Sequence, residues 1–153
     1  MPMGWWRVIV CSMISWYLKM ACLGLLLGRF LAAQFGWLDL PTWWSGSELL
    51  TVGLVLMGAG CSVWHGLLLR RSDGLETERG LFRWVRHPMY VGDFFTLTGF
   101  ALLPLGPDST VLWLVGVVAV WRCAVVEDAE LAREWGEVHA RWRGRTGLVF
   151  PGK

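Results

Sequence analysis

The sequence predicts an all-α integral membrane protein, a helical bundle with about four transmembrane helices. Three observations lead to this fold class. The chain has 153 residues, of which 55% are hydrophobic and only 17% are charged, whereas soluble domains carry about 25% charged residues. It contains 12 tryptophans, a residue type that favours membrane interfaces. Its apolar residues also form segments of about the 20 residues that a helix needs to cross a bilayer.

The first two predicted spans are residues 7–31 and 49–69. Lys19 lies near the middle of the first span and Arg29 near its end, where a charge must pair with another group or extend to the interface. The second span contains no charged residue, and its most polar member is His65. The sequence alone does not show whether Lys19 and His65 reach a functional site.

The last two predicted spans, residues 89–105 and 109–126, form a tight hairpin. Only Gly106, Pro107 and Asp108 separate them, and these are typical turn residues. The hairpin places Asp93 and Arg122 at similar depth on neighbouring helices. Because unpaired charges inside a membrane are costly, we expect these two side chains to interact.

Basic residues predict the orientation in the membrane. Arginines gather in the loop of residues 70–88 and in the tail of residues 127–153, whereas residues 35–47 and 106–108 contain no lysine or arginine. Both termini and the central loop are therefore expected in the cytoplasm. The tail is expected to form an amphipathic helix that lies along the interface or folds back over the hairpin, with its apolar residues on one face: Leu131, Trp135, Val138 and Trp142.

Two polar clusters flank the hairpin. Arg86, His87 and Tyr90 surround the start of the third span, where Pro88 suits the first helical position and the free N–H groups favour anions. Glu127 and Asp128 follow the fourth span directly, so the hairpin places them beside Arg86 and His87. The alternatives are a basic interface loop with a capping histidine and a solvated acidic stripe. The four cysteines lie singly in apolar segments, and no metal site is expected.

The order and spacing of these motifs resemble the isoprenylcysteine carboxyl methyltransferase family, which belongs to a wider group of integral membrane methyltransferases that includes phospholipid N-methyltransferases. The resemblance covers residues 80–152 of a single domain of residues 1–153. Its elements are Arg86-His87-Pro88-x-Tyr90-x-Gly92, Glu127-Asp128-x-x-Leu131, Trp135-Gly136-Glu137 and Arg145-Thr146-Gly147-Leu148.

The resemblance implies S-adenosyl-L-methionine as cofactor, held between the loop before the third span, the end of the fourth span and the tail. Cofactor-binding residues would be Phe82, His87, Tyr90, Gly92, Glu127, Asp128 and Leu131. Arg86, Glu127 and Arg145 would be the catalytic residues. The chain departs from the family pattern in two of these positions, because Phe82 replaces a tyrosine and Asp128 a glutamate, and further on His139 and Trp142 stand where the family often has tyrosines.

The expected acceptor is lipophilic: a small molecule, a lipid or a lipidated cysteine. A carboxylate acceptor would be oriented by Arg86 or Arg145, whereas an amine acceptor must lose a proton, for which Glu127 or Asp128 would be the base. The residues leave both open. The composition looks bacterial, which predicts the inner membrane as location. The net charge of +2 gives no reason to expect nucleic acid. Other possible functions are a membrane reductase with a nicotinamide cofactor and a non-enzymatic subunit that binds anionic lipid.

Overall fold

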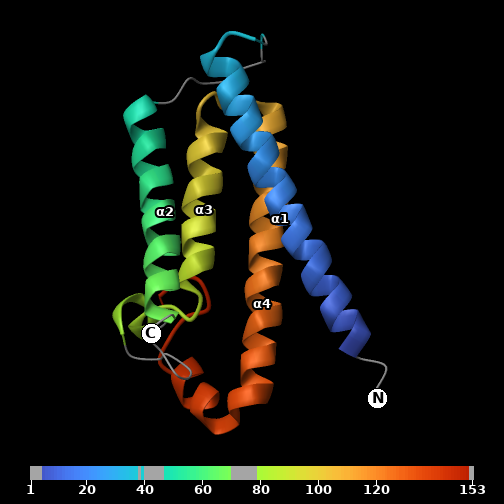
Figure 1. The fold of residues 1–153 in the computed structure, drawn as a ribbon, viewed down its shortest axis with the longest axis vertical. Coiled ribbons are helices and arrows are strands. Elements are labelled where there is room, and N and C mark those ends of the chain that lie inside the picture. Colours follow the sequence, from blue (N-terminus) through green and yellow to red (C-terminus); the bar gives the residue numbers. More distant parts are fainter. Residues whose placement is uncertain (1–4, 38, 40–46, 70–78, 152–153) are drawn as a thin grey trace.

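The chain folds into a bundle of helices (Figure 1). A computed structural model describes residues 5–37, 39, 47–69 and 79–151, with the backbone alone for residues 5–12 and 69. The elements are α1 (Trp5–Gln34), α2 (Glu48–Leu69), the short 3-10 helix η1 (Gly80–Arg83), α3 (Pro88–Leu102) and α4 (Pro107–Arg143). Within the described part of the chain there are no strands, only one isolated bridge between Val85 and Gly147. The predicted all-α fold is confirmed.

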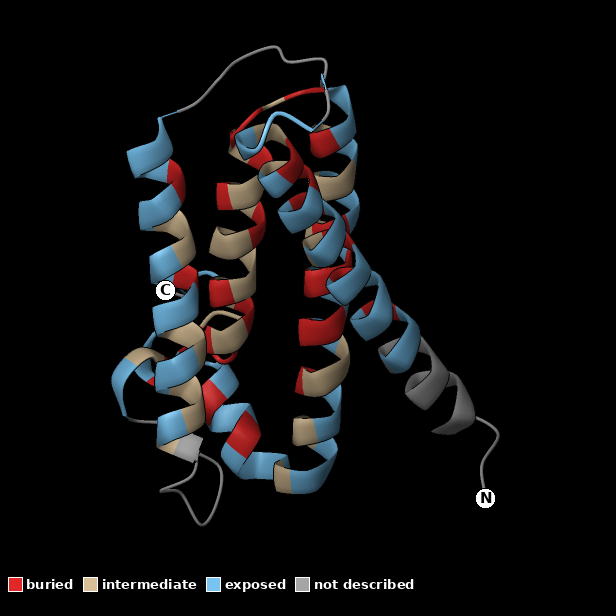
Figure 2. Cartoon of the chain, turned by 45° about the horizontal axis from the view of Figure 1, so that its top comes forward, coloured by how far each residue is buried: buried red, intermediate tan, exposed pale blue. Residues whose placement is uncertain are grey.

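Three of the helices are long and apolar enough to cross a membrane: Met13–Gln34, Glu48–Leu68 and Pro107–Arg143. The third predicted span is shorter than expected, because α3 has 15 residues and ends at Leu102. Leu103 is already extended, as is usual for the residue before a proline. The fourth predicted span continues instead as α4 to Arg143. Exposed apolar residues cover the outer faces of the bundle (Figure 2), where lipid would surround them.

Glycine lets α2 and α3 approach closely. A Cβ atom at Gly92 on α3 would lie 2.6 Å from the carbonyl oxygen of Gly58 on α2 and 3.0 Å from the Cβ of Cys61. Small residues are common where membrane helices pack backbone against backbone. In Figure 1, α3 stands between α2 and α4, and α1 crosses α4. The hairpin therefore forms the middle of the bundle.

Two ion pairs tie α1 to the hairpin. The Lys19 Nζ lies 2.7 Å from Asp93 Oδ2. Nearer the end of α1, the Arg29 guanidinium donates to both carboxylate oxygens of Asp108, at 2.5 and 2.9 Å, and to the carbonyl of Pro104. The predicted partner of Asp93 was therefore wrong: among the described residues its ion pair is with Lys19, whereas Arg122 is exposed on the surface of α4.

The end of α4 turns back beneath the bundle. Gly136 has φ 46°, outside the helical range, and the chain bends there (Figure 1). On the predicted apolar face of the tail Trp142 is buried as expected, but Val138 is 43% exposed, and the bend turns its neighbour His139 inward instead. After α4, Gly147 and Leu148 accept hydrogen bonds from the backbone N–H groups of Arg86 and His87, at 2.8 and 3.1 Å. The tail thus folds back onto the start of α3.

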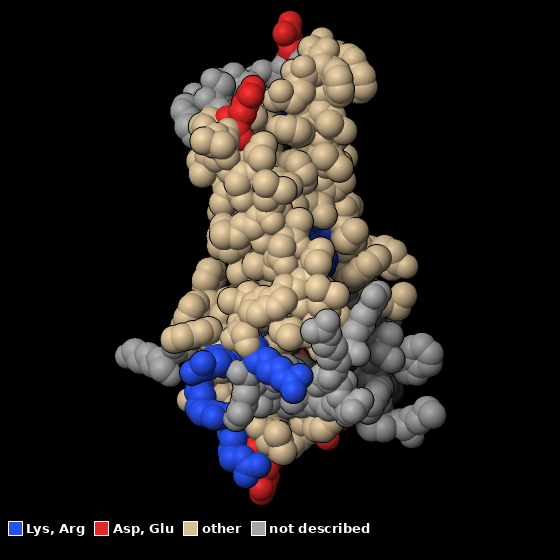
Figure 3. Space-filling view, turned by 60° about the vertical axis from the view of Figure 1, so that its left-hand side comes forward, with Lys and Arg blue, Asp and Glu red and all other residues tan. Residues whose placement is uncertain are grey.

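The start of α1, the end of α2, η1 and the tail lie at one end of the bundle (Figure 1), as the predicted orientation requires. Figure 3 shows charged side chains at the two ends of one face and a broad, mostly uncharged band between them. This distribution is typical of a membrane-spanning bundle. Which end faces the cytoplasm stays a prediction.

Candidate functional site

The short helix η1 begins the loop that carries the first polar cluster, and Phe82 anchors it. Phe82 is buried, and its ring lies 5.5 Å from that of His65 and 6.2 Å from that of Trp142, measured between centroids. Its carbonyl accepts a hydrogen bond of 3.0 Å from the Trp142 indole. These contacts make Phe82 a packing residue between α2 and the returning end of α4.

Arg86 is buried and joins three segments of the chain. Its Nε donates to Asp128 Oδ1 at 2.7 Å, and its Nη1 donates to the carbonyls of Thr146 at 2.5 Å and Arg143 at 3.4 Å. Charge-assisted hydrogen bonds of this kind are strong when both partners are desolvated. Arg86 therefore links the loop before α3 to α4 and to the tail. Its predicted catalytic role stays a prediction.

Asp128 is the centre of this buried network. Besides the contact with Arg86, its Oδ1 lies 3.0 Å from Nε2 of His139 and 3.6 Å from Nε2 of His87. Asp128 is 7% exposed. A carboxylate so deeply buried requires such partners, because its desolvation is otherwise very costly. The acidic cluster is thus not a solvated stripe at this position.

His87 lies at the N-terminus of α3 and is 3% exposed. It makes no side-chain capping hydrogen bond, so the interpretation as a capping histidine is wrong. Its Nδ1 lies 3.7 Å from Glu127 Oε1. Its buried Nε2 has no hydrogen-bond partner among the described residues, with Asp128 Oδ1 3.6 Å away. Burial lowers the pKa of His87, although the carboxylates of Glu127 and Asp128 act in the opposite direction.

Glu127 is the open carboxylate of the site. Its side chain is 40% exposed, in contrast to the buried side chain of its neighbour Asp128. The Tyr90 phenol lies against it closely enough to interact with the carboxylate. The Tyr90 ring also lies 5.7 Å from the ring of His87. The structure thus brings His87, Tyr90 and Glu127 together, as the hairpin predicted.

Two polar residues of the first two helices also reach this cluster, and no sequence motif marks either of them. His65 on α2 interacts electrostatically with Glu127, and its buried Nδ1 has no hydrogen-bond partner in the described part of the chain. Lys19 on α1 lies 5.1 Å from the centroid of the Tyr90 ring. In the sequence, their polarity inside otherwise apolar spans is the feature that could have marked them as candidate site residues.

The other predicted site residues lie around this cluster. Gly92 is at the contact between α2 and α3, where helix packing alone requires a glycine. Leu131 is half-buried on α4. Arg145 is exposed, and its backbone N–H donates to the carbonyl of Trp142 at 3.0 Å. Their predicted roles in cofactor binding and catalysis stay predictions.

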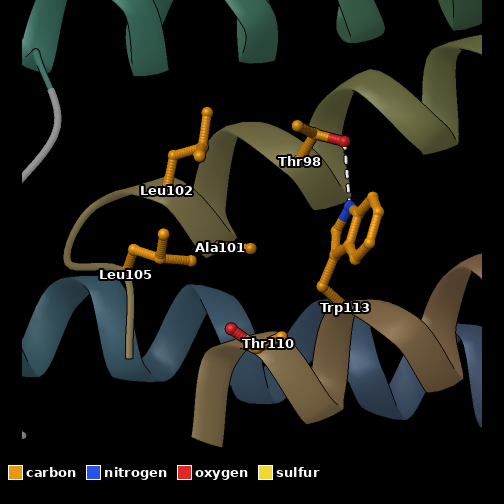
Figure 4. Close-up of a pocket in the computed structure, with 6 residues that line it drawn as sticks. All are labelled: Thr98, Ala101, Leu102, Leu105, Thr110 and Trp113. Carbon is orange, nitrogen blue, oxygen red and sulfur yellow. Dashed lines mark hydrogen bonds between the residues drawn. The ribbon is translucent and has the colours of Figure 1, made fainter. Parts of the chain in front are cut away.

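A separate cavity of about 320 Å³ lies at the other end of α3, between α3 and α4 (Figure 4). Its polar groups bond within the protein: Thr98 donates to the carbonyl of Phe94 at 2.7 Å and accepts from the Trp113 indole at 3.0 Å, and Thr110 donates to Gly106 at 2.8 Å. The cavity is therefore apolar. None of the predicted site residues lines it; its walls are Thr98, Ala101, Leu102, Leu105, Thr110 and Trp113.

Comparison with known proteins identifies the class of protein. Residues 48–138 match the phospholipid methyltransferase family. Because this match covers more than half of the chain, the chain belongs to that family, and the predicted resemblance to the membrane methyltransferases is confirmed. The match extends from α2 to the bend in α4 and includes both polar clusters, whereas α1 lies outside it.

The chain is also similar to the protein-S-isoprenylcysteine O-methyltransferase of Saccharomyces cerevisiae. The two are 26% identical over 83 residues, which cover 54% of this chain and 35% of the yeast protein. The chain thus matches about a third of the length of that relative. No solved structure matches the chain.

Proposed function

We propose that the protein is an integral membrane methyltransferase that transfers a methyl group from S-adenosyl-L-methionine to a lipophilic acceptor. Membership of the phospholipid methyltransferase family supports the reaction class. The observation that carries the location of the site is the buried ring of His87, whose Nδ1 lies 3.7 Å from the open carboxylate of Glu127. The family match favours neither the nicotinamide-dependent reductase nor the lipid-binding subunit.

The residues of this cluster fit the cofactor. S-adenosylmethionine carries a sulfonium and an ammonium group, both cations that the carboxylate of Glu127 would attract. The phenol of Tyr90, which interacts with Glu127, would line the same site. Nδ1 of His87 lies 3.7 Å from Glu127 Oε1, so a ligand held by that carboxylate would also meet this nitrogen. His87, Tyr90 and Glu127 are therefore the residues that we expect to hold the cofactor.

The cofactor supplies an already activated methyl group, so the protein's own residues chiefly position the reactants and exclude water. The network of Arg86, Asp128 and His139 fixes α4 against the loop before α3. It thereby holds Glu127 and His87 at a set distance. The apolar outer surface of the bundle would let a lipophilic acceptor approach from the membrane, while the cofactor would enter from water.

The contacts favour an amine acceptor over a carboxylate. An amine must lose its proton before it attacks, and Glu127 is a half-exposed carboxylate that can accept that proton. A carboxylate would need a cation to orient it, but Nε and Nη1 of Arg86 already donate to Asp128 and to the tail. Arg145, which is exposed, is the other cation that could orient a carboxylate acceptor.

For the cell, we propose the inner membrane of a bacterium, with both termini and the central loop on the cytoplasmic side. The proposal rests on the composition and on the arginines of residues 70–88 and of the tail. His87 begins α3 at the end of the bundle where η1 and the returning end of α4 also lie (Figure 1). The cofactor site would then face the cytoplasm.

Binding of S-adenosylhomocysteine to the purified protein in detergent tests the proposal. We expect calorimetry to give micromolar binding for the wild type and a loss of binding in His87→Ala and Glu127→Gln. Glu130→Gln is the matched control, because Glu130 is exposed on the same helix. A folded wild type that does not bind S-adenosylhomocysteine would refute the proposal. Transfer of labelled methyl groups into lipid extracts would then identify the acceptor.

A further inference from the structure

Helix α1 places a buried cation next to the site. Lys19 lies within the candidate span Met13–Gln34, and its side chain is only 5% exposed. Its Nζ lies 2.7 Å from Oδ2 of Asp93, whose side chain is 18% exposed. Ionisable groups inside a membrane are costly and are retained mainly for function. This pair therefore requires an explanation beyond hydrophobic packing.

The same ammonium also contacts Tyr90. Its Nζ is 5.1 Å from the centroid of the Tyr90 ring, within the range of a cation–π interaction. Tyr90 and Asp93 are three residues apart on α3, so they share one face of the helix. Lys19 can therefore contact both at once. The Tyr90 ring also lies 5.7 Å from the ring of His87, measured between centroids, and its phenol interacts with Glu127.

The need to hold α1 against the hairpin does not by itself explain why α1 contains a buried lysine at position 19. Arg29 already makes that attachment, through its hydrogen bonds to Asp108 and Pro104 at the far end of the hairpin. Ten residues separate Lys19 from Arg29, which corresponds to about 15 Å along the helix. The two ion pairs are thus similar in chemistry, but only one of them contacts a residue of the site.

We propose that Lys19 is a positioning residue of the cofactor site, which fixes the ring of Tyr90 and, through it, the approach to Glu127. This inference rests on the proposed function. It extends the site to α1, which lies outside the residues 48–138 that match the family. Lys19 also neutralises Asp93, so that Glu127 is the carboxylate that an incoming cation meets.

The chain contains only two tyrosines, Tyr17 and Tyr90, which allows a test that does not need turnover. Protein labelled with 3-fluorotyrosine gives two fluorine NMR signals, and Tyr17→Phe assigns them. We expect Lys19→Met to shift the Tyr90 signal and to weaken S-adenosylhomocysteine binding about tenfold. Arg29→Met, the matched loss of an α1 ion pair, is expected to change neither.

A double-mutant cycle separates positioning from general stability. In a Tyr90→Leu background, Lys19→Met should have no further effect on binding, because Lys19 acts through the ring. If Lys19→Met does not fold, Lys19→Arg, which keeps the charge, serves for the same test. We then expect a shifted Tyr90 fluorine signal and a smaller loss of S-adenosylhomocysteine binding. An unchanged Tyr90 signal, or equal losses in Lys19→Met and Arg29→Met, would overturn the inference. A wild type that binds no S-adenosylhomocysteine would instead overturn the proposed function.

Discussion

Replacing Asp128 with asparagine should destabilise the protein strongly. The change removes the charge that pairs with Arg86 at 2.7 Å and contacts His139 at 3.0 Å. Arg86 and Asp128 are each 7% exposed, so solvent cannot replace the lost partner. Removing one member of a buried pair costs about 3–5 kcal/mol. Because asparagine keeps an oxygen that can accept one hydrogen bond, we expect the lower end, about 3 kcal/mol.

Equilibrium unfolding by SDS in dodecyl maltoside micelles, followed by tryptophan fluorescence, would measure this loss. Glu130→Gln, at an exposed position on the same helix, should stay within about 0.5 kcal/mol of wild type. The double variant Arg86→Met/Asp128→Leu should recover much of the loss, since it leaves no unpaired charge. If Asp128→Asn lost less than about 0.5 kcal/mol, or if the double variant were no more stable than Asp128→Asn, the network would not have the role that we assign to it.

Two further changes can be followed in the same unfolding assay. Burial lowers the pKa of His87, so the unfolded chain binds a proton first as the pH falls. Stability should therefore be constant above about pH 6.5 and fall below it by at most about 1.4 kcal/mol per pH unit. His87→Gln should remove this fall. Gly92→Ala should cost about 1–3 kcal/mol, because its Cβ would lie 2.6 Å from the Gly58 carbonyl oxygen. Gly60→Ala is the control, since nothing lies within 4 Å of a Cβ there, and a loss in both variants alike would contradict the packing argument.

The sequence predicted the hairpin and the meeting of the two polar clusters correctly, and the reason is local. A connection of a few residues forces α3 and α4 to run antiparallel, so the residue before α3 lies beside the residues of α4 that are about as far from the turn. The 3.7 Å contact between His87 and Glu127 follows from this connectivity. The contact between His87 and Glu127 does not depend on the positions of α1 and α2.

The partner of Asp93 could not be predicted in the same way. Counting residues along two helices gives depth in the membrane, but it does not give the direction in which each side chain points around its helix. Asp93 points toward α1, where Lys19 meets it. That contact joins residues 74 positions apart, so it depends on how α1 crosses the hairpin. The same crossing explains why Lys19 could not be assigned to the site.

The predicted apolar face of the tail helix is wrong at Val138, because the helix is not continuous. A regular helix would place Val138 and Trp142 on one stripe with Leu131. Gly136, with φ 46°, interrupts it and rotates the residues that follow. Val138 is then exposed, whereas His139 is buried and reaches Asp128. Glycine inside a helical pattern was the available signal, since it adopts this conformation without a Cβ clash.

The adjacent carboxylates Glu127 and Asp128 have different surroundings, although the family resemblance implies one shared role for them. Neighbouring residues of a helix point about 100° apart, so the two side chains cannot face the same partners. Asp128 points inward to Arg86 and His139, and its charge holds the fold together. Glu127 remains 40% exposed beside His87. Removal of the charge at Asp128 should therefore reduce stability first, whereas its removal at Glu127 should reduce ligand binding in a protein that still folds.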